Sequence, residues 1–316
     1  MKISLVILTC NRKDSVFSLL KSIENQTDGP HEIIVVDNAS EDGTLNLIAD
    51  FFADVLVVGL DHNMGASGRN EGIKKASGDI IITLDDDVFF SSSSDLAKIE
   101  KKFKQDQNIS VLNFRILDGE TKRVIPFNWF HPYKMEDYAD IDFLTDYISE
   151  GAVAFRREVF AMVGYYPEEF FISHEGPDLA YRLLDAGLDI YYTADVSVIH
   201  KCSTEHRVSW RNTYYDTRNQ IWLAVRNLPL IMAISHISYR LLTTLLFALW
   251  RRQLKWYFKA VFDGFKGIKD EIHKRKVISK ETIRKIKRIR KNKPGFGYKL
   301  LSFIKRANAI NKKFAR

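Results

Sequence analysis

Cysteine is nearly absent from this 316-residue chain, which contains only Cys10 and Cys202. Neither residue belongs to a CxxC or Cys/His cluster, so the pattern argues against a disulfide framework or a zinc site and suits a reducing compartment. Glycine-rich phosphate loops are also lacking, because no GxGxxG or P-loop follows a strand-like run, and a dinucleotide-binding or kinase-like function has no support. The apolar N-terminal run is interrupted at Asn11-Arg12-Lys13, too soon for a signal peptide, and we expect a buried strand there.

Acidic residues are scarce in the last fifth of the chain. Residues 251–316 contain 23 Lys and Arg against four acidic residues, a balance of +19, and the net charge of +7 leaves −12 for residues 1–250. A basic tail on an acidic body is expected to seek a polyanionic surface, either lipid headgroups or nucleic acid. The charge of the body counts against nucleic acid as the partner.

One long apolar stretch, Leu228–Trp250, precedes this tail. It is as long as a membrane span, but His236 and Arg240 lie inside it, and a charge in mid-membrane is costly. Bases and aromatic residues mix directly after it, as in helices that lie in the membrane interface. The stretch therefore predicts attachment to an anionic membrane surface, and spanning and surface-lying arrangements both stay open. The expected organisation is an α/β domain over 1–205, a helical membrane-associating extension over 206–260 and a basic tail over 261–316.

Short β-branched runs alternate with helical patterns over the first 90 residues. Uniformly apolar runs suit strands buried on both faces, and the β-α-β order predicts a mainly parallel sheet with right-handed crossovers. In such sheets ligands bind outside the carboxyl ends of the strands. Polar residues gather at these ends, and a functional site is predicted there. The four polar stretches are Thr9–Asn11, Asp37–Ser40, Asn63–Arg69 and Asp85–Asp87.

Three consecutive aspartates, Asp85, Asp86 and Asp87, end the fourth run. Side chains alternate along an extended strand, so we expect Asp85 and Asp87 to project together and Asp86 to project the other way. Two like charges on one side of a buried sheet edge are unfavourable unless a cation lies between them, and a hard divalent cation that also bridges a diphosphate supplies that charge. A solvated acidic turn before the next helix is the alternative.

Taken together and in order, these segments resemble the family 2 glycosyltransferases. The resemblance covers most of residues 1–205, and it implies the single-domain, Rossmann-like GT-A fold with a mainly parallel central sheet, followed here by amphipathic and basic C-terminal helices. The similar segments are VILTCNR (6–12), IIVVDNASEDGT (33–44), NMGASGRNEGIKKASGDIIITLDDDV (63–88), GAVAFRREVFAMVG (151–164) and FFISHEGPDLAYRL (170–183).

The resemblance implies roles for the polar strand ends. Asp37 would accept a hydrogen bond from the N–H of a pyrimidine ring, and an Asx turn is its alternative role. Asp85 and Asp87 would ligate Mn²⁺ or Mg²⁺, which stabilises the departing nucleoside diphosphate. His200 resembles a further ligand of the metal or diphosphate, with a structural hydrogen bond as the alternative. The residues implied to bind the nucleotide sugar are Thr9, Asn11, Asp37, Asn38, Arg69, Asp85 and Asp86.

The catalytic base departs from the family pattern. Many relatives have Glu-Asp-x-Asp-Leu-x-x-Arg, and the Asp directly after the Glu is the usual base, but Gly176 stands at that position here. Inverting transfer still needs a carboxylate to take the proton of the acceptor hydroxyl. Glu175 is the first candidate, because its longer side chain can reach a similar space. Asp178 is the second, with helix capping or an ion pair with Arg182 as its alternative.

The resemblance thus implies a metal-dependent, inverting glycosyltransferase. The donor would be a nucleotide sugar, with UDP or dTDP favoured, and the acceptor a glycan or a lipid-linked precursor of a cell-surface polysaccharide or glycoconjugate. The expected location is cytoplasmic, at the inner face of the membrane. A sugar nucleotidyltransferase is disfavoured because TCNRKD lacks a glycine-rich phosphate cradle after the first strand. A non-catalytic scaffold with an inert body is the other alternative, which Gly176 keeps open.

Overall fold

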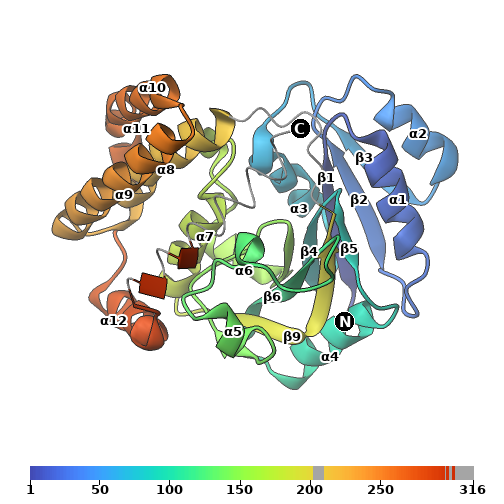
Figure 1. Ribbon diagram of the computed structural model, residues 1–316. Coiled ribbons are helices and arrows are strands. Elements are labelled where there is room, and N and C mark those ends of the chain that lie inside the picture. The colour runs from blue at the N-terminus through green and yellow to red at the C-terminus, as the bar shows by residue number, and fades with distance from the viewer. Residues whose placement is uncertain (202–209, 296, 299–300, 303–316) are drawn as a thin grey trace.

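The computed structural model describes residues 1–201, 210–295, 297–298 and 301–302. The first part of the chain follows the predicted alternation of strands and helices (Figure 1). Its apolar, β-branched runs form strands because such side chains pack well on a pleated surface that is covered on both faces. The elements are β1 (Ile3–Thr9), α1 (Lys13–Ile23), β2 (Glu32–Asp37), α2 (Thr44–Phe51), β3 (Val55–Gly59), η1 (Gly65–Gly68), α3 (Arg69–Lys75) and β4 (Ile80–Asp85).

The aromatic-rich middle of the chain completes the same sheet. It adds strands of both directions and short helical turns between them. The elements are β5 (Val88–Phe90), α4 (Asp95–Gln105), β6 (Ile109–Asp118), η2 (Pro126–Asn128), α5 (Met135–Tyr138), β7 (Phe143–Leu144), β8 (Ala152–Arg156), α6 (Glu158–Val163), η3 (Glu168–Phe170), α7 (Glu175–Asp185) and β9 (Asp189–His200).

The strands form one nine-stranded sheet in the order β3-β2-β1-β4-β8-β6-β9-β5, and β7 pairs with β9 at its side. The four strands of the first part run parallel, as predicted. β8 is antiparallel to β4 and β6, while β6 and β9 are parallel to each other. The predicted α/β domain is therefore confirmed, and the antiparallel β8 turns its start toward the end of β4, where the aspartates lie.

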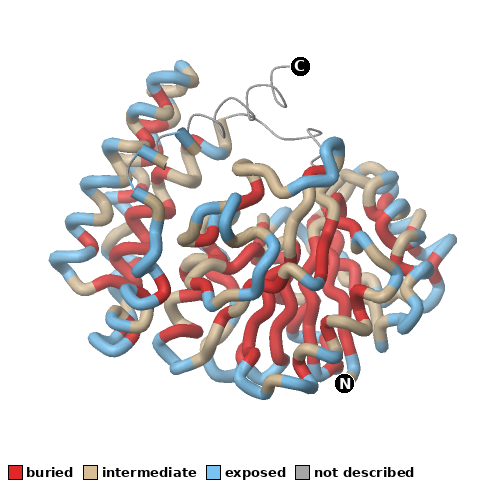
Figure 2. The backbone as a smooth tube through the Cα atoms, turned by 60° about the horizontal axis from the view of Figure 1, so that its bottom comes forward, coloured by how far each residue is buried: buried red, intermediate tan, exposed pale blue. Residues whose placement is uncertain are grey.

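Two apolar layers cover the faces of the sheet. On one face α1 and α4 pack through Leu19, Leu20 and Phe103. On the other face α3, α6 and α7 pack through side chains such as Ile73 and Leu183. Figure 2 shows the consequence, because the strands are buried along most of their length and the outer surfaces of the helices are exposed.

Helices make up the C-terminal part, and α8 to α11 lie together beside the sheet domain in Figure 1. α12 packs on α7, and its Ile286 and Ile289 belong to the same apolar layer as Leu183. The predicted boundary between 260 and 261 falls inside α10, and the boundary between 205 and 206 lies outside the described residues. The elements are α8 (Trp210–Asn227), α9 (Leu230–Trp250), α10 (Leu254–Lys266), α11 (Ile268–His273), α12 (Lys280–Ile289) and η4 (Arg290–Asn292).

Within the described residues, α9 is the one helix long and apolar enough to cross a membrane. Most of it is exposed, but His236 and Arg240, which interrupt its apolar sequence, contact the neighbouring helix α8. His236 Nε2 lies 2.6 Å from Gln220 Oε1, and Arg240 lies 3.6 Å from the carboxylate of Asp216. These contacts satisfy the groups that made a span costly, and they hold one side of α9 against the folded protein.

Candidate active site

The carboxyl ends of β1, β2 and β4 meet at one edge of the sheet. β1 lies between the other two, with Thr9 opposite Asp37 of β2 and Leu8 opposite Asp85 of β4. Neighbouring parallel strands are about 4.8 Å apart, so this register places the polar ends side by side. The predicted convergence of polar strand ends is thus present in the structure.

Asp85, the last residue of β4, contacts the buried guanidinium of Arg69. The same guanidinium donates to the carbonyl of Ala66 at 3.1 Å, which fixes it under the loop between β3 and α3. Burial lowers the pKa of Arg69, but the negative charge of Asp85 raises it, and the net shift is upward. Arg69 is 5% exposed, so its guanidinium does not project into solvent.

Asp86 and Asp87 share a cation that the sequence analysis did not assign to them. One nitrogen of Arg12, Nη1, lies 2.7 Å from Asp86 Oδ1 and 3.2 Å from Asp87 Oδ2. Thr9 donates its hydroxyl to the other oxygen of Asp86 at 2.8 Å. Burial raises the pKa of Asp86 to about 6, although Arg12 opposes the shift.

The expectation that Asp86 projects away from Asp87 is wrong. β4 ends at Asp85, and a turn follows before β5 begins at Val88. The alternation of side chains applies only to extended backbone, so it stops at the strand end. Asp86 and Asp87 therefore face the same side chain, that of Arg12, while Asp85 contacts Arg69.

His200 lies beside the aspartates, because β5 and β9 pair with Val88 opposite His200. Its Nε2 is 3.4 Å from Asp87 Oδ1, and this buried nitrogen has no hydrogen-bond partner among the described residues. Two ligand atoms bound to one divalent cation at about 2.1 Å each are separated by about 3.0–3.5 Å. The two side chains thus fit a divalent cation in their spacing and chemistry. In the described part of the chain no three acidic, His or Cys side chains form a complete metal cage.

Asp37, at the end of β2, lies at the same sheet edge opposite Thr9. Asp37 Oδ2 accepts the N–H of Ser40 at 3.0 Å, which is the turn interaction that the sequence offered as its alternative role. Its Oδ1 is buried and has no hydrogen-bond partner among the described residues. A buried carboxylate oxygen without a donor is costly, and a ligand N–H would satisfy it.

The two asparagines of the predicted site hold its loops. Asn38 accepts the N–H of Met64 at 2.8 Å and donates to the carbonyl of Gly65 at 2.9 Å, which ties the end of β2 to η1. Asn11, at a positive φ of 53°, accepts the N–H of Glu41 at 2.7 Å. Both side chains therefore shape the edge through backbone contacts.

Glu175, the first residue of α7, lies near the same edge, and the charge of a second glutamate, Glu150, acts on it. Burial, together with the charge of Glu150, raises the pKa of Glu175 to about 8. Burial also raises the pKa of Glu150. Glu175 is 6% exposed, and its Oε2 has no hydrogen-bond partner in the described residues. A carboxyl group in this state is protonated at neutral pH, which disfavours the predicted role of Glu175 as a base.

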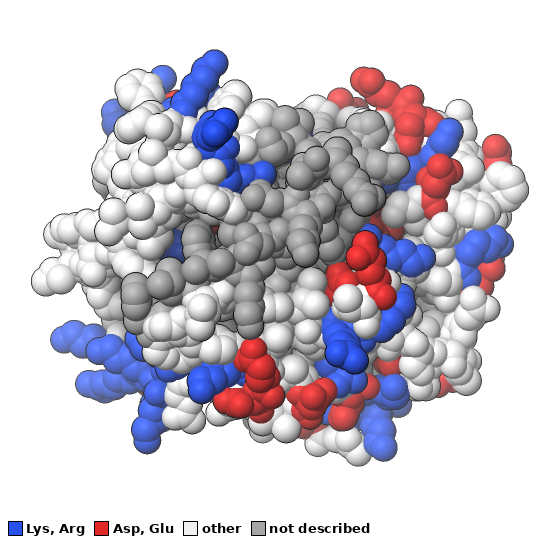
Figure 3. Space-filling model, viewed as in Figure 1, with Lys and Arg blue, Asp and Glu red and all other residues white. Residues whose placement is uncertain are grey.

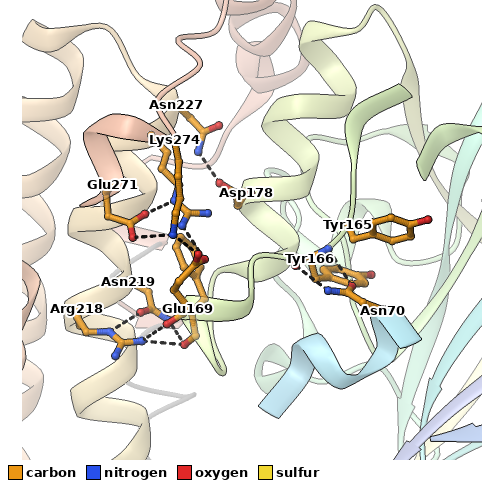
Figure 4. Close-up of polar contacts among 12 residues, drawn as sticks. Asn70, Tyr165, Tyr166, Glu169, Asp178, Arg218, Asn219, Asn227, Glu271 and Lys274 are labelled. Carbon is orange, nitrogen blue, oxygen red and sulfur yellow. Dashed lines mark hydrogen bonds and ion pairs between the residues drawn. The ribbon is translucent and has the colours of Figure 1, made fainter. Parts of the chain in front are cut away.

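Asp178, the second candidate base, lies at the junction between α7 and the helical extension. Its carboxylate accepts from Arg182 at 3.0 Å and from the side chain of Asn227, on α8, at 2.8 Å. Figure 4 shows Asn227 directed at Asp178, away from Asn70 and Tyr166. Asp178 thus makes the ion pair with Arg182 that was its alternative role, and it is occupied by structural contacts.

The helical extension also holds the loop that leads into α7. Asn219, on α8, donates to the carbonyls of Ile172 and Ser173 at 2.8 and 2.7 Å. Arg218 donates to the carbonyl of Glu169 at 2.8 Å (Figure 4). Ser173 and His174 have positive φ angles of 72° and 70°, an unfavourable conformation for these residues. α8 therefore compensates local backbone strain next to Glu175.

Comparison with known proteins identifies the chain. The model of the family described as "Glycosyl transferase family 2" matches residues 4–164, about half of the chain. The chain belongs to glycosyltransferase family 2. This family match contains every strand end described above, and β9 with His200 lies beyond it.

Three relatives illustrate the similarity of this family 2 chain. The O-antigen chain rhamnosyltransferase WbaN of Salmonella anatum is 26% identical over 205 residues, which are 62% of this chain and 64% of the relative. TarS 1–349 of S. aureus, solved with UDP-GlcNAc, has a TM-score of 0.58, 17% identity, and coverage of 100% of this chain and 91% of TarS. The mannosyltransferase PcManGT of Pyrobaculum calidifontis, solved with GDP-Man and Mn²⁺, has a TM-score of 0.55, 15% identity, and coverage of 98% and 87%.

These comparisons confirm the predicted GT-A fold. At under 25% identity the solved structures show the fold alone. The chain spans less than two thirds of the length of the first curated relatives that it matches.

Two residues of this family 2 site had no role in the sequence analysis. Arg12 was considered only as part of a polar interruption, yet its position one residue after Asn11 placed it at the same strand end. Glu150 directly precedes the segment GAVAFRREVFAMVG and was not considered at all. An acidic residue immediately before a family segment was the one available signal for it.

Proposed function

We propose that this family 2 chain transfers a sugar, with inversion, from a nucleotide sugar to a glycan or lipid-linked acceptor in the synthesis of a cell-surface polysaccharide or glycoconjugate. The observation that carries the proposal is the buried Oδ1 of Asp37, which has no hydrogen-bond partner among the described residues. Asp37 is in register with Thr9, beside the Asp86–Asp87–His200 group. One group accepts a base N–H and the other suits a cation bound to a diphosphate. A nucleoside diphosphate carries both features.

The donor base is proposed to be uracil or thymine. Both rings carry an N–H that a carboxylate accepts, and Asp37 Oδ1 lacks a donor among the described residues. Two similar proteins support this class: TarS was solved with UDP-GlcNAc, and a dTDP-rhamnosyl transferase of Shigella flexneri is 24% identical over 271 residues. Guanine stays a competitor, since PcManGT was solved with GDP-Man.

Asp87 and His200 are the proposed protein ligands of Mn²⁺ or Mg²⁺, and Asp85 lies two residues before Asp87. Such an ion normally takes one or two protein carboxylates together with substrate phosphates, so an incomplete protein cage is expected. The bound ion would supply positive charge for the diphosphate as the sugar departs. The guanidinium of Arg12 supplies positive charge to Asp86 and Asp87, and the Thr9 hydroxyl orients Asp86.

A nucleotide-sugar screen tests this proposal. UDP-glucose, UDP-GlcNAc, UDP-galactose, dTDP-rhamnose and GDP-mannose are each added with and without Mn²⁺, and thermal stability and release of the nucleoside diphosphate are measured. We expect one uridine or thymidine donor to stabilise the protein and to be hydrolysed only with Mn²⁺. Absence of any Mn²⁺-dependent effect across the panel would favour the alternative of an inert body.

The proposed location is the cytoplasmic face of an anionic membrane, with α9 and α10 lying on it. Their apolar membrane face consists of side chains 49% to 67% exposed, and exposed bases such as Arg252, Lys255 and Lys259 lie near it. Figure 3 shows uncharged surface on the side of the helical extension, with Lys and Arg above and below it. Each base near an anionic surface adds about 1 kcal/mol of attraction. The membrane face is formed by Leu242, Leu246, Leu249, Phe258, Phe262 and Phe265.

Paired substitutions on α10 test this location. Phe258→Ser with Phe262→Ser removes apolar area from the membrane face without touching the core, so binding to vesicles of phosphatidylcholine and phosphatidylglycerol should fall at least tenfold. Co-sedimentation measures the effect. Met162→Ser, which removes a comparably exposed apolar side chain from α6, is the matched control. Equal sedimentation of the wild type and the double variant would count against the membrane face.

A further inference from the structure

Glu150 occupies the space that a side chain at position 176 would need. Gly176 lies in the first turn of α7, and a Cβ atom there would overlap the carboxylate of Glu150 and lie 2.8 Å from the carbonyl oxygen of Ile148. The N–H of Gly176 donates to Glu150 Oε1 at 2.6 Å. A carboxylate from another part of the chain therefore stands where the family pattern has an aspartate.

The backbone of Glu150 is held firmly against β4. Thr83 donates its hydroxyl to the carbonyl of Glu150 at 2.7 Å, and the N–H of Asp85 donates to the carbonyl of Gly151 at 3.1 Å. A Cβ atom at Gly151 would overlap the Asp85 carboxylate, so glycine at this position lets the backbone approach Asp85 in its present rotamer. Glu150 is thereby placed at the same sheet edge as the proposed donor site.

Glu150 and Glu175 have different surroundings, and this difference indicates which of the two carboxyl groups is protonated. Glu150 is half-buried and accepts an N–H at the N-terminal end of α7, where the helix dipole favours negative charge. Glu175 is buried, and its Oε2 lacks a donor among the described residues. A buried pair of carboxyl groups holds one proton at neutral pH, and the better solvated and hydrogen-bonded member is the ionised one. Glu150 is that member.

We propose that Glu150 is the general base of glycosyl transfer in this chain, in place of the aspartate that Gly176 replaces. The inference rests on the function proposed above and names the residue that performs its proton transfer. It also changes the role of Glu175 from the base to a neutral neighbour that keeps the pair at one negative charge. Arg69 and Asp85 are the other charged groups near the pair, and their charges oppose each other.

The reaction balances without a further reactant. The Glu150 carboxylate takes the proton of the acceptor hydroxyl while the hydroxyl oxygen forms a bond to the anomeric carbon. The bond from that carbon to the diphosphate oxygen breaks, and its electron pair leaves with the nucleoside diphosphate. Glu150 then releases the proton to water, for which its partial exposure provides access. The products are the glycoside, the nucleoside diphosphate and one proton.

The test compares Glu150→Gln with Glu175→Gln and with the exposed control Glu158→Gln. The measurements are the rate of diphosphate release from the donor found in the nucleotide-sugar screen and the affinity for UDP. We expect Glu150→Gln to lower the rate about 10²- to 10⁴-fold, the usual range for loss of a general base, while the affinity for UDP changes less than threefold. Glu175→Gln should cost much less than Glu150→Gln, since glutamine resembles a protonated glutamate.

Each outcome bears on one proposal only. A wild type that hydrolyses no donor contradicts the proposed function. An active wild type whose Glu150→Gln variant keeps its rate within tenfold, or whose Glu175→Gln variant loses more, overturns the assignment of Glu150. If the glutamine variant folds poorly, Glu150→Ala is measured with and without added formate, which can act as a base in place of the missing carboxylate. A rate gain with formate that Glu158→Gln does not show supports Glu150 as the base, and no gain contradicts it.

Discussion

Two pairs of acidic side chains lie at the same sheet edge, but they are neutralised in different ways. Asp86 and Asp87 share the guanidinium of Arg12, whereas no guanidinium among the described residues forms an ion pair with Glu150 or Glu175, and the charge of Glu150 raises the pKa of Glu175. Burial raises the pKa of Asp86 to about 6 and that of Glu175 to about 8. The first pair suits a bound cation, and the second suits proton transfer. The surroundings of a carboxyl group, rather than its identity, thus divide the tasks of the site.

The largest expected effect comes from substituting Asp87, the proposed metal ligand in the first pair. Asp87→Asn should lower Mn²⁺-dependent release of the diphosphate at least about 100-fold, because a bound cation stabilises the leaving group by several kcal/mol. Unlike Glu150→Gln, it should also weaken the Mn²⁺-dependent binding of UDP, which calorimetry measures. Asp79→Asn, an exposed change just before the other end of β4, is the control. A variant that retains Mn²⁺-dependent UDP binding would remove Asp87 from the metal site.

Removing the shared guanidinium should destabilise only the first pair. Arg12→Gln leaves Asp86 and Asp87 buried without their cation, and breaking such a pair costs about 3 kcal/mol. The free energy of unfolding in urea measures this loss. Added Mn²⁺ should recover more stability in the variant than in the wild type, since the ion replaces the lost charge. An identical Mn²⁺ response in both proteins would contradict the idea that this pair is built around a cation.

The second pair, Glu150 and Glu175, should make the free energy of unfolding depend on pH. The folded-state pKa of Glu175, about 8, lies above its ordinary value of 4.5. Between these values the unfolded chain loses the proton and the folded chain keeps it, so the free energy of unfolding falls as pH rises, by up to about 1.4 kcal/mol per pH unit. Glu175→Gln lacks this loss, and its advantage over the wild type should grow from pH 5 to pH 8. Parallel stability curves over this range would show that Glu175 is ionised in the folded protein.

The C-terminal helices were predicted as an appendage, and the structure ties them to the α/β domain. Arg226 contacts both Glu169 and Glu271, and Lys274 contacts Glu169 across the same junction (Figure 4). Asn219 holds the loop before α7. No composition rule connects residues so far apart in the chain, so the sequence offered no signal for these contacts. Deletion of the helices would therefore disturb the site, and point substitutions on the membrane face are the cleaner experiment.

The order of elements in the first 90 residues was predictable because local patterns decide it. Uniformly apolar, β-branched runs form buried parallel strands, and their carboxyl ends meet at one edge wherever the crossovers are right-handed. That argument places Thr9, Asp37 and Asp85 at one sheet edge from the sequence alone. It failed at Asp86 and Asp87, since the end of a strand is among the least predictable features of a sequence.

The sequence by itself therefore determined the fold, the family and the edge of the sheet where the donor is proposed to bind. Only the tertiary structure decided which carboxylate faces which partner. Arg12 contacts Asp86 and Asp87, which are more than 70 residues away in the sequence. Glu150 contacts Gly176, which is 26 residues away in the sequence. The state of a carboxyl group depends on its burial and on the charges within a few ångströms. These distances exist only once β4, β8 and α7 have packed together.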